Sequence, residues 1–81
     1  MPTIFIHEGY RFFFFSNEGY PLKPPHVHVR RDKSVAKFWL EPDVRLAESF
    51  KMTLREIRYL THLIERNKEL IKKAWNDHVR D

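Results

Sequence analysis

The chain has 81 residues, a formal net charge of +4 and no cysteine. This length fits one domain, and the absence of cysteine excludes a disulfide framework and thiolate chemistry. The basic charge favours a nucleic acid or an acidic partner. No apolar run approaches the roughly 20 residues of a membrane-spanning helix, and residues 1–6 are too short for a signal-peptide core. We therefore expect a cytoplasmic protein with no membrane partner.

Short apolar segments separated by turn signals predict a β-rich first part, residues 1–48. A strand is expected over residues 2–6, and Glu8-Gly9 is a turn signal. The next segment, 10–16, is so aromatic that both faces of the strand must be partly covered. Three prolines and a glycine make 17–25 a loop. Three further segments complete this part: strands over 26–31 and 35–40, joined by a turn at 32–34, and a strand or linker over 44–48.

The last third of the chain has the periodicity of a helix. Thr53 and Glu56 carry the signature of a capping box. Apolar residues that fall on one stripe of the helix follow: Ile57, Leu60, Ile64, Ile71 and Trp75. We predict one long helix over 53–79 with this stripe against the sheet. The alternative is that Asn67 caps a second helix that begins at Lys68.

Together these segments predict a single α+β domain over residues 1–81. It has a small antiparallel sheet of three to five strands, followed by one long C-terminal helix packed on one face. The apolar arc of the helix is wider than one small sheet covers, because a second apolar stripe lies beside the first. We therefore expect self-association or a small protein partner at Tyr59, Leu63 and Leu70.

The segment Pro24-Pro25-His26-Val27-His28-Val29-Arg30-Arg31 is the most informative one. Successive side chains of a strand point to opposite faces, so the two valines are expected to face the core. His26, His28 and Arg30 then share the other surface. Two imidazoles that titrate near neutral pH are a candidate acid–base pair for cleavage of RNA. The alternative is a structural role, in which both histidines fix the proline-rich approach.

Basic residues cluster at the predicted hairpin: Arg30, Arg31, Lys33 and Lys37. They are candidates for binding phosphates or an acidic partner. The alternative is that these charges keep an edge hairpin soluble. No metal site is predicted, because a His-x-His pair lacks further ligands at a recognisable spacing. No cofactor is predicted either, because two isolated glycines do not make a phosphate-binding loop.

Nearly the whole chain resembles, in order and scale, a bacterial family of small proteins, domain of unknown function 4160. The resemblance is carried by Met-Pro-Thr-Ile at the start, the aromatic strand, Pro24-Pro25-His26-Val27-His28-Val29 and Trp75-Asn76. It implies a small cytoplasmic protein. By analogy with the gene neighbourhood of such proteins, beside domain of unknown function 2442, it also implies one component of a toxin–antitoxin-like pair. Family members often carry Asp-His before the double proline, whereas this chain has no histidine over 17–23, so a mechanism with three histidines is not expected.

Two functions therefore stay open. The first is a small basic interaction module that binds a cognate protein partner or a second copy of itself. The alternative is a ribonuclease-like or nucleic-acid-binding effector, for RNA or DNA, that uses the surface of His26, His28 and Arg30. The burial of the two histidines separates the two functions, because an acid and a base must both reach the substrate.

Overall fold

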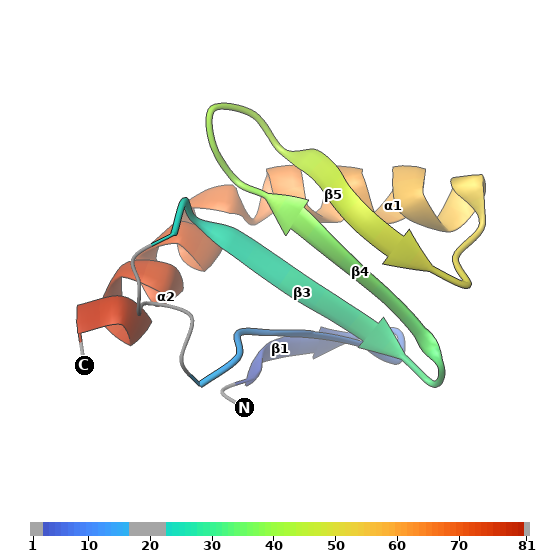
Figure 1. Cartoon of the computed structure of the whole chain (residues 1–81), viewed down its shortest axis with the longest axis horizontal. Helices are drawn as coiled ribbons and strands as arrows, with labels where there is room; N and C mark the ends of the chain where they lie inside the picture. The colour runs from blue at the N-terminus through green and yellow to red at the C-terminus, as the bar shows by residue number, and fades with distance from the viewer. Residues whose placement is uncertain (1–2, 17–22, 81) are drawn as a thin grey trace.

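The computed structural model describes residues 3–16 and 23–80 (Figure 1). Five strands precede two helices. The elements are β1 (Thr3–His7), β2 (Tyr10–Phe13), β3 (His26–Arg31), β4 (Ser34–Trp39), β5 (Arg45–Phe50), α1 (Leu54–Arg66) and α2 (Lys68–Arg80). The strands form one antiparallel sheet in the order β1-β2-β3-β4-β5. The predicted α+β fold is confirmed, and the segment left open as strand or linker is β5.

Both helices cover the same face of the sheet, behind β3, β4 and β5 in the view of Figure 1. The core lies between the two layers. Val27 and Val29 are fully buried, as strand alternation predicts. They pack in one cluster with the predicted helical stripe, of which Leu60, Ile64 and Ile71 are fully buried. Among the described residues, neither helix is long and apolar enough to cross a membrane.

The prediction of one long helix is wrong, because the chain bends at Asn67. The Asn67 side chain donates a hydrogen bond to the carbonyl of Leu63 (2.8 Å), and its backbone N–H also caps the last turn of α1. The Asn67 carbonyl accepts the first hydrogen bond of α2, from the Ile71 amide (3.0 Å). The apolar period continues through the bend, so periodicity alone predicts a continuous helix. The alternative weighed from the sequence, a second helix from Lys68, is the one observed.

The start of α1 is tied to the sheet through a capping box. The Thr53 hydroxyl accepts a hydrogen bond from the Glu56 amide, and the Glu56 carboxylate accepts one from the Thr53 amide (both 3.0 Å). The second carboxylate oxygen of Glu56 accepts a hydrogen bond from the Tyr10 hydroxyl (2.7 Å). These bonds, that from the Thr53 amide first, hold the pKa of Glu56 below its ordinary value. Burial, together with the bond to Glu56, raises the pKa of Tyr10.

This arrangement predicts a pH dependence of stability. A carboxyl whose pKa is lowered by folding stabilises the fold fully above its ordinary pKa, and loses this contribution as the pH falls through the folded-state pKa. Glu56→Gln keeps a side chain that suits a capping box but removes the titrating group. We expect the free energy of unfolding, measured in urea at a series of pH values, to fall less steeply below pH ~5 in the variant. Parallel curves for the two proteins would contradict this role of Glu56.

Candidate functional site

The face of the sheet opposite the helices carries the candidate site. Side chains that pair directly across antiparallel strands lie on the same face, so the register defines its layout. One row across β2 to β5 is Phe13, His28, Lys37 and Glu48. A second row is Arg11, Arg30, Val35 and Phe50, and the end of β3 adds a third of His26, Trp39 and Arg45. We refer to this surface as the open face.

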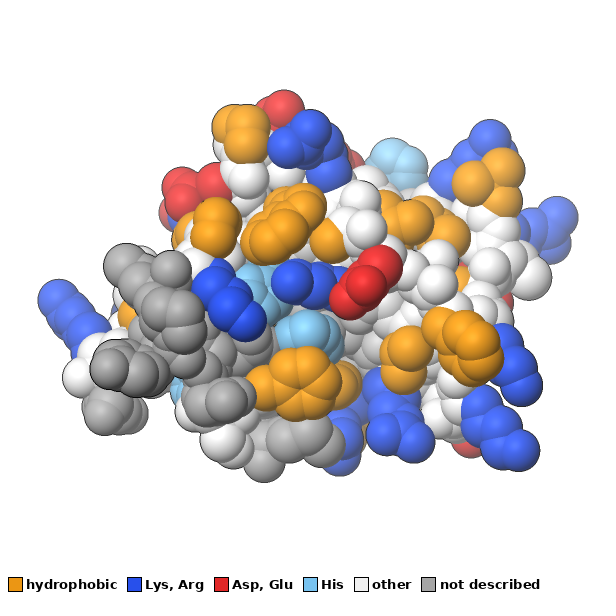
Figure 2. Space-filling model, viewed as in Figure 1, with side chains coloured by type: hydrophobic (Ala, Val, Ile, Leu, Met, Phe, Trp, Pro, Cys, Tyr) orange, Lys and Arg blue, Asp and Glu red, His pale blue; other side chains and the backbone are white. Residues whose placement is uncertain are grey.

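A groove of about 350 Å³ crosses the open face. Its walls combine aromatic and charged side chains, chiefly Phe13, Phe15, His28, Arg30, Lys37, Glu48 and Phe50. Phe15 and Phe50 are 43% and 58% exposed and lie on either side of the groove. Figure 2 shows histidine, cationic and hydrophobic side chains gathered over β3 and its neighbours on this face. The groove is therefore neither a purely apolar surface nor a purely charged one.

Cations on the open face lie over aromatic rings. The Arg11 guanidinium lies 5.0 Å from the centre of the Phe13 ring, and the Lys37 ammonium lies 4.5 Å from that of Trp39. Arg30 Nε donates a hydrogen bond to the Asp32 carbonyl (3.1 Å) in the hairpin turn. Such contacts hold the stems of long side chains against the sheet and leave their charge near its surface.

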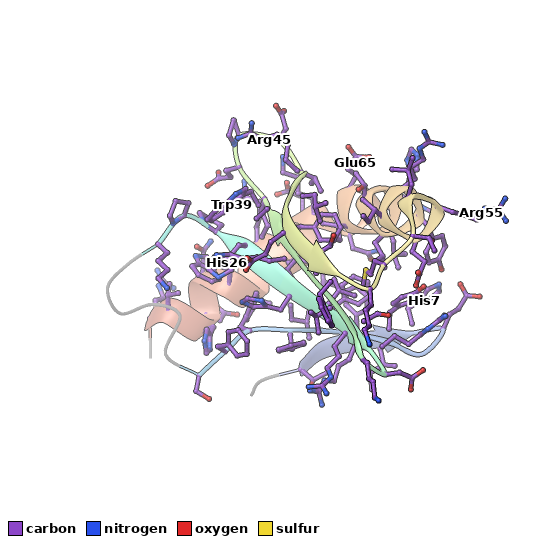
Figure 3. The ribbon with its side chains drawn as sticks, turned by 45° about the vertical axis from the view of Figure 1, so that its right-hand side comes forward. His7, His26, Trp39, Arg45, Arg55 and Glu65 are labelled. Atoms are coloured by element: carbon purple, nitrogen blue, oxygen red, sulfur yellow. The ribbon has the colours of Figure 1, made fainter. Side chains whose placement is uncertain are left out.

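The prediction that His26 is exposed beside His28 is wrong, because His26 is fully buried. Its ring packs edge-on against Trp39 and tilted against Trp75 of α2, at centroid distances of 5.6 and 4.8 Å. Strand alternation gives only the side of the strand on which a residue lies. It does not show that Trp75 and Trp39 enclose this end of β3, where Figure 3 places His26 beside Trp39. The His26 Nδ1 lies 2.9 Å from the Pro24 carbonyl, and because a carbonyl only accepts, this nitrogen carries the hydrogen.

His28 is half-buried and lines the groove, and it lies on the same face of β3 as Arg30, as predicted. Its ring stacks on Phe13 and lies against Phe15, with centroid distances of 5.6 and 4.2 Å. The rings of His26 and His28 are neighbours, 5.2 Å apart and edge to face. Only His28 faces the groove, so the fold brings the histidines together without presenting both to one ligand.

The predicted basic cluster is divided by the sheet. Arg30 and Lys37 line the groove. The Arg31 guanidinium lies over the ring of Tyr10, at 4.5 Å, and Tyr10 belongs to the core on the helix side. Lys33 lies exposed in the hairpin turn. Alternation separates adjacent residues of one strand, and so Arg30 and Arg31 serve different faces. Within residues 3–16 and 23–80, no group of three or more His, Asp or Glu is placed to hold a metal ion.

The predicted interface residues do not form one patch. Tyr59 donates a hydrogen bond to the Glu8 carboxylate, which raises the pKa of Tyr59. Leu63 is half-buried and packs against the core cluster, so part of the second helical stripe is used within the molecule. Both residues line a second groove, of about 550 Å³, between β1 and α1. Leu70 is 53% exposed on α2 and lies outside that groove.

Several residues of the open face are not singled out by the sequence, among them Arg11, Arg45, Glu48 and Phe50. The sequence does indicate that a strand after the hairpin would pair with β4, which would place Glu48 in the sheet. Because residues 44–48 fit either a strand or a linker, the sequence does not define which side of the sheet their side chains occupy. The structure also extends this strand to Phe50, two residues beyond the expected end.

Comparison with known proteins matches the chain to a protein-family model. A family model described as Domain of unknown function (DUF4160) covers residues 9–76, from the β1–β2 turn into α2. This range contains the histidine strand and most of the open face. No curated protein and no solved structure matches the chain.

Proposed function

The chain belongs to the domain of unknown function 4160 family, and we propose that it is a small binding module that holds a single strand of nucleic acid on the open face of its sheet. The observation that carries this proposal is the pair of exposed phenylalanines, Phe15 and Phe50, on either side of a groove lined by Arg30 and Lys37.

Each part of the groove suits one part of a nucleic-acid strand. An exposed aromatic ring stacks on an unpaired base of any sequence, because every base has a π-face. Arginine and lysine side chains neutralise phosphates and release counterions. The Phe15 ring lies against His28 of β3, and two strand spacings, about 10 Å, separate β3 from β5. Bases on Phe15 and Phe50 would therefore be splayed apart rather than stacked on each other. A duplex keeps its bases paired and stacked, and does not offer them in this way.

The geometry supports binding rather than cleavage. Acid–base cleavage of RNA needs two proton-transferring groups within reach of the substrate. His26 is fully buried and its Nδ1 is committed to the Pro24 carbonyl. His28 lines the groove, but no second histidine of the described residues does. We therefore assign a structural role to the two histidines, and phosphate binding to Arg30 and Lys37.

The proposal is tested by fluorescence anisotropy with labelled oligonucleotides of about ten nucleotides, at low and moderate salt. We expect single-stranded RNA or DNA to bind more tightly than the corresponding duplex, with an affinity that falls as salt rises. Incubation with the single-stranded RNA should leave it uncut. The absence of salt-dependent binding to any oligonucleotide would overturn the proposal, and cleavage lost in His28→Gln would favour the ribonuclease-like alternative.

Phe50→Ala should weaken binding of the single strand by about 1–3 kcal/mol, because one base loses its stacking partner. The side chain is 58% exposed, so the fold should tolerate the change. Leu70→Ala is a matched control, since it removes a similarly exposed apolar side chain from α2. The two dissociation constants, measured in the same buffer, should differ by at least about fivefold. Equal losses in both variants would exclude Phe50 from the binding surface.

A second candidate function is binding of a small cognate protein, as in a toxin–antitoxin-like pair in the cytoplasm. The groove between β1 and α1 favours it, because two of the residues expected at an interface, Tyr59 and Leu63, line that groove. This surface is separate from the open-face groove, so the two candidate functions do not exclude each other.

A further inference from the structure

The first strand of the sheet, β1, is an edge strand without charged side chains, and its pairing with β2 is irregular between Thr3 and Phe5. Among the strands that the structure describes, β1 pairs with β2 alone, so no described strand pairs with its other side. Edge strands are usually guarded by charged side chains that prevent pairing with another chain. The opposite edge, β5, carries Arg45 and Glu48. β1 reads Thr-Ile-Phe-Ile-His and has no lysine, arginine, aspartate or glutamate, and its Ile6 is 66% exposed.

The hairpin geometry shows which backbone groups of β1 are turned outwards. Glu8 and Gly9 both have positive φ and form a two-residue turn, so the flanking residues His7 and Tyr10 form a hydrogen-bonded pair. Hydrogen-bonded and non-hydrogen-bonded pairs alternate in an antiparallel ladder. Ile6, which is opposite Arg11, therefore directs its N–H and C=O away from β2. These groups are placed to pair with an additional strand.

The groove beside this edge has an apolar floor and a basic rim. Phe5 and Leu63 are half-buried at its floor, and both pack against the core cluster. Along α1, the spacing of three and four residues places four exposed cationic or titratable side chains on one stripe: Arg55, Arg58, His62 and Arg66. His62 and Arg66 line the groove, and Figure 3 shows Arg55 projecting outwards from the start of α1. The stripe spans about 17 Å, the length of a five-residue strand.

Two carboxylates lie near this rim. His62 Nδ1 is 3.6 Å from Glu65, and His7 Nε2 is 3.4 Å from Glu8, which also accepts the bond from Tyr59. Both histidines therefore already have a carboxylate partner within the molecule. The three arginines are the charges that the stripe offers to a partner.

We propose that β1 binds an extended, acidic segment of a partner protein, which adds to the sheet as a sixth strand. Apolar side chains of the segment lie over Phe5 and Leu63, and its carboxylates pair with the arginines of α1. A second copy of this chain does not fit, because pairing β1 with β1 would bring two basic stripes together. This inference rests on the second candidate function, protein binding, and is independent of nucleic-acid binding on the open face.

The test uses two fluorescein-labelled peptides of about eight residues, a short run of valines flanked either by glutamates or by lysines. The whole chain should bind the glutamate peptide and not the lysine peptide. Ile6→Pro removes the outward N–H at an edge position that tolerates proline, and should weaken binding by at least about tenfold. Hydrogen exchange should show the Ile6 amide protected in the complex of the unmodified chain.

Charge reversal on α1 distinguishes binding at this site from nonspecific electrostatic binding of the peptide. Arg58→Glu with Arg66→Glu should abolish binding of the glutamate peptide and permit binding of the lysine peptide. Lys73→Glu with Arg80→Glu makes the same charge change on exposed positions of α2 and should alter neither result. Circular dichroism confirms that each variant is folded.

Each outcome is decisive for the edge site. Equal binding of both peptides, no binding of the glutamate peptide, or no effect of Ile6→Pro would overturn the proposal. Sedimentation that shows a dimer lost in Ile6→Pro would assign the edge to a second copy instead. Binding of single-stranded oligonucleotides by the same samples reports separately on the open face, so failure of one proposal is not confused with failure of the other.

Discussion

Ile64→Ala should lower the free energy of unfolding by about 2–5 kcal/mol. Ile64 is fully buried in α1 and belongs to the core cluster between helices and sheet. Removing its outer carbons takes apolar surface out of the core and leaves a cavity that the strands cannot fill by moving. A chain of this size has a total stability of only about 4–12 kcal/mol, so the loss is a large part of it.

The measurement is urea unfolding followed by circular dichroism, with the midpoint and slope fitted for both proteins. Leu54→Ala is the matched control, because Leu54 is the first residue of α1 and is largely exposed. We expect the control to change stability by less than about 0.5 kcal/mol. A loss below that value in Ile64→Ala would contradict the placement of the helical stripe against the sheet.

The parts of the fold that the sequence predicts are those set by local patterns. The capping box at Thr53 places the start of α1, because two side chains three residues apart supply its hydrogen bonds. Alternation in β3 assigns Val27 and Val29 to the core, and the stripe of α1 and α2 assigns Leu60, Ile64 and Ile71 to it.

Other features depend on contacts between segments distant in the chain. His26 is buried because Trp75, 49 positions away, reaches the end of β3. No pattern within β3 contains that contact. The bend at Asn67 also escapes periodicity, since residues on both sides of it keep the same apolar stripe against one core.

The open face shows the same division. Alternation along β3 correctly predicts that His28 and Arg30 share one face. Because β3 is regular, the same alternation places Arg31 on the other face. Phe50 lies in the groove because it pairs with Val35. This pairing depends on a register shift between Lys37 and Phe38, which adds one residue to β5 between the pairs Phe38–Leu46 and Lys37–Glu48. An irregularity of this kind changes which residues of β5 share the face, and it is set by the pairing rather than by either strand alone.

Replacing both groove cations should produce the largest change in nucleic-acid binding. Each phosphate contact to a single strand contributes about 0.7 to the slope of log affinity against log salt concentration. If Arg30 and Lys37 each neutralise one phosphate, the double variant Arg30→Gln with Lys37→Gln should have a slope smaller by about 1.4. At ~0.1 M salt this corresponds to an affinity about 25-fold lower. Glutamine is chosen because it retains part of the side-chain stem that covers Trp39.

The control for this prediction is Lys73→Gln with Arg80→Gln, which removes the same formal charge from exposed positions of α2. Both double variants lower the net charge equally, so a field that acts on the whole molecule would affect them alike. Contacts in the groove would lower the slope only in the Arg30 and Lys37 variant. The measurement is anisotropy titration of one labelled single strand at several salt concentrations. Equal slopes for the two variants would remove the open face as the binding surface, even if the unmodified chain binds nucleic acid.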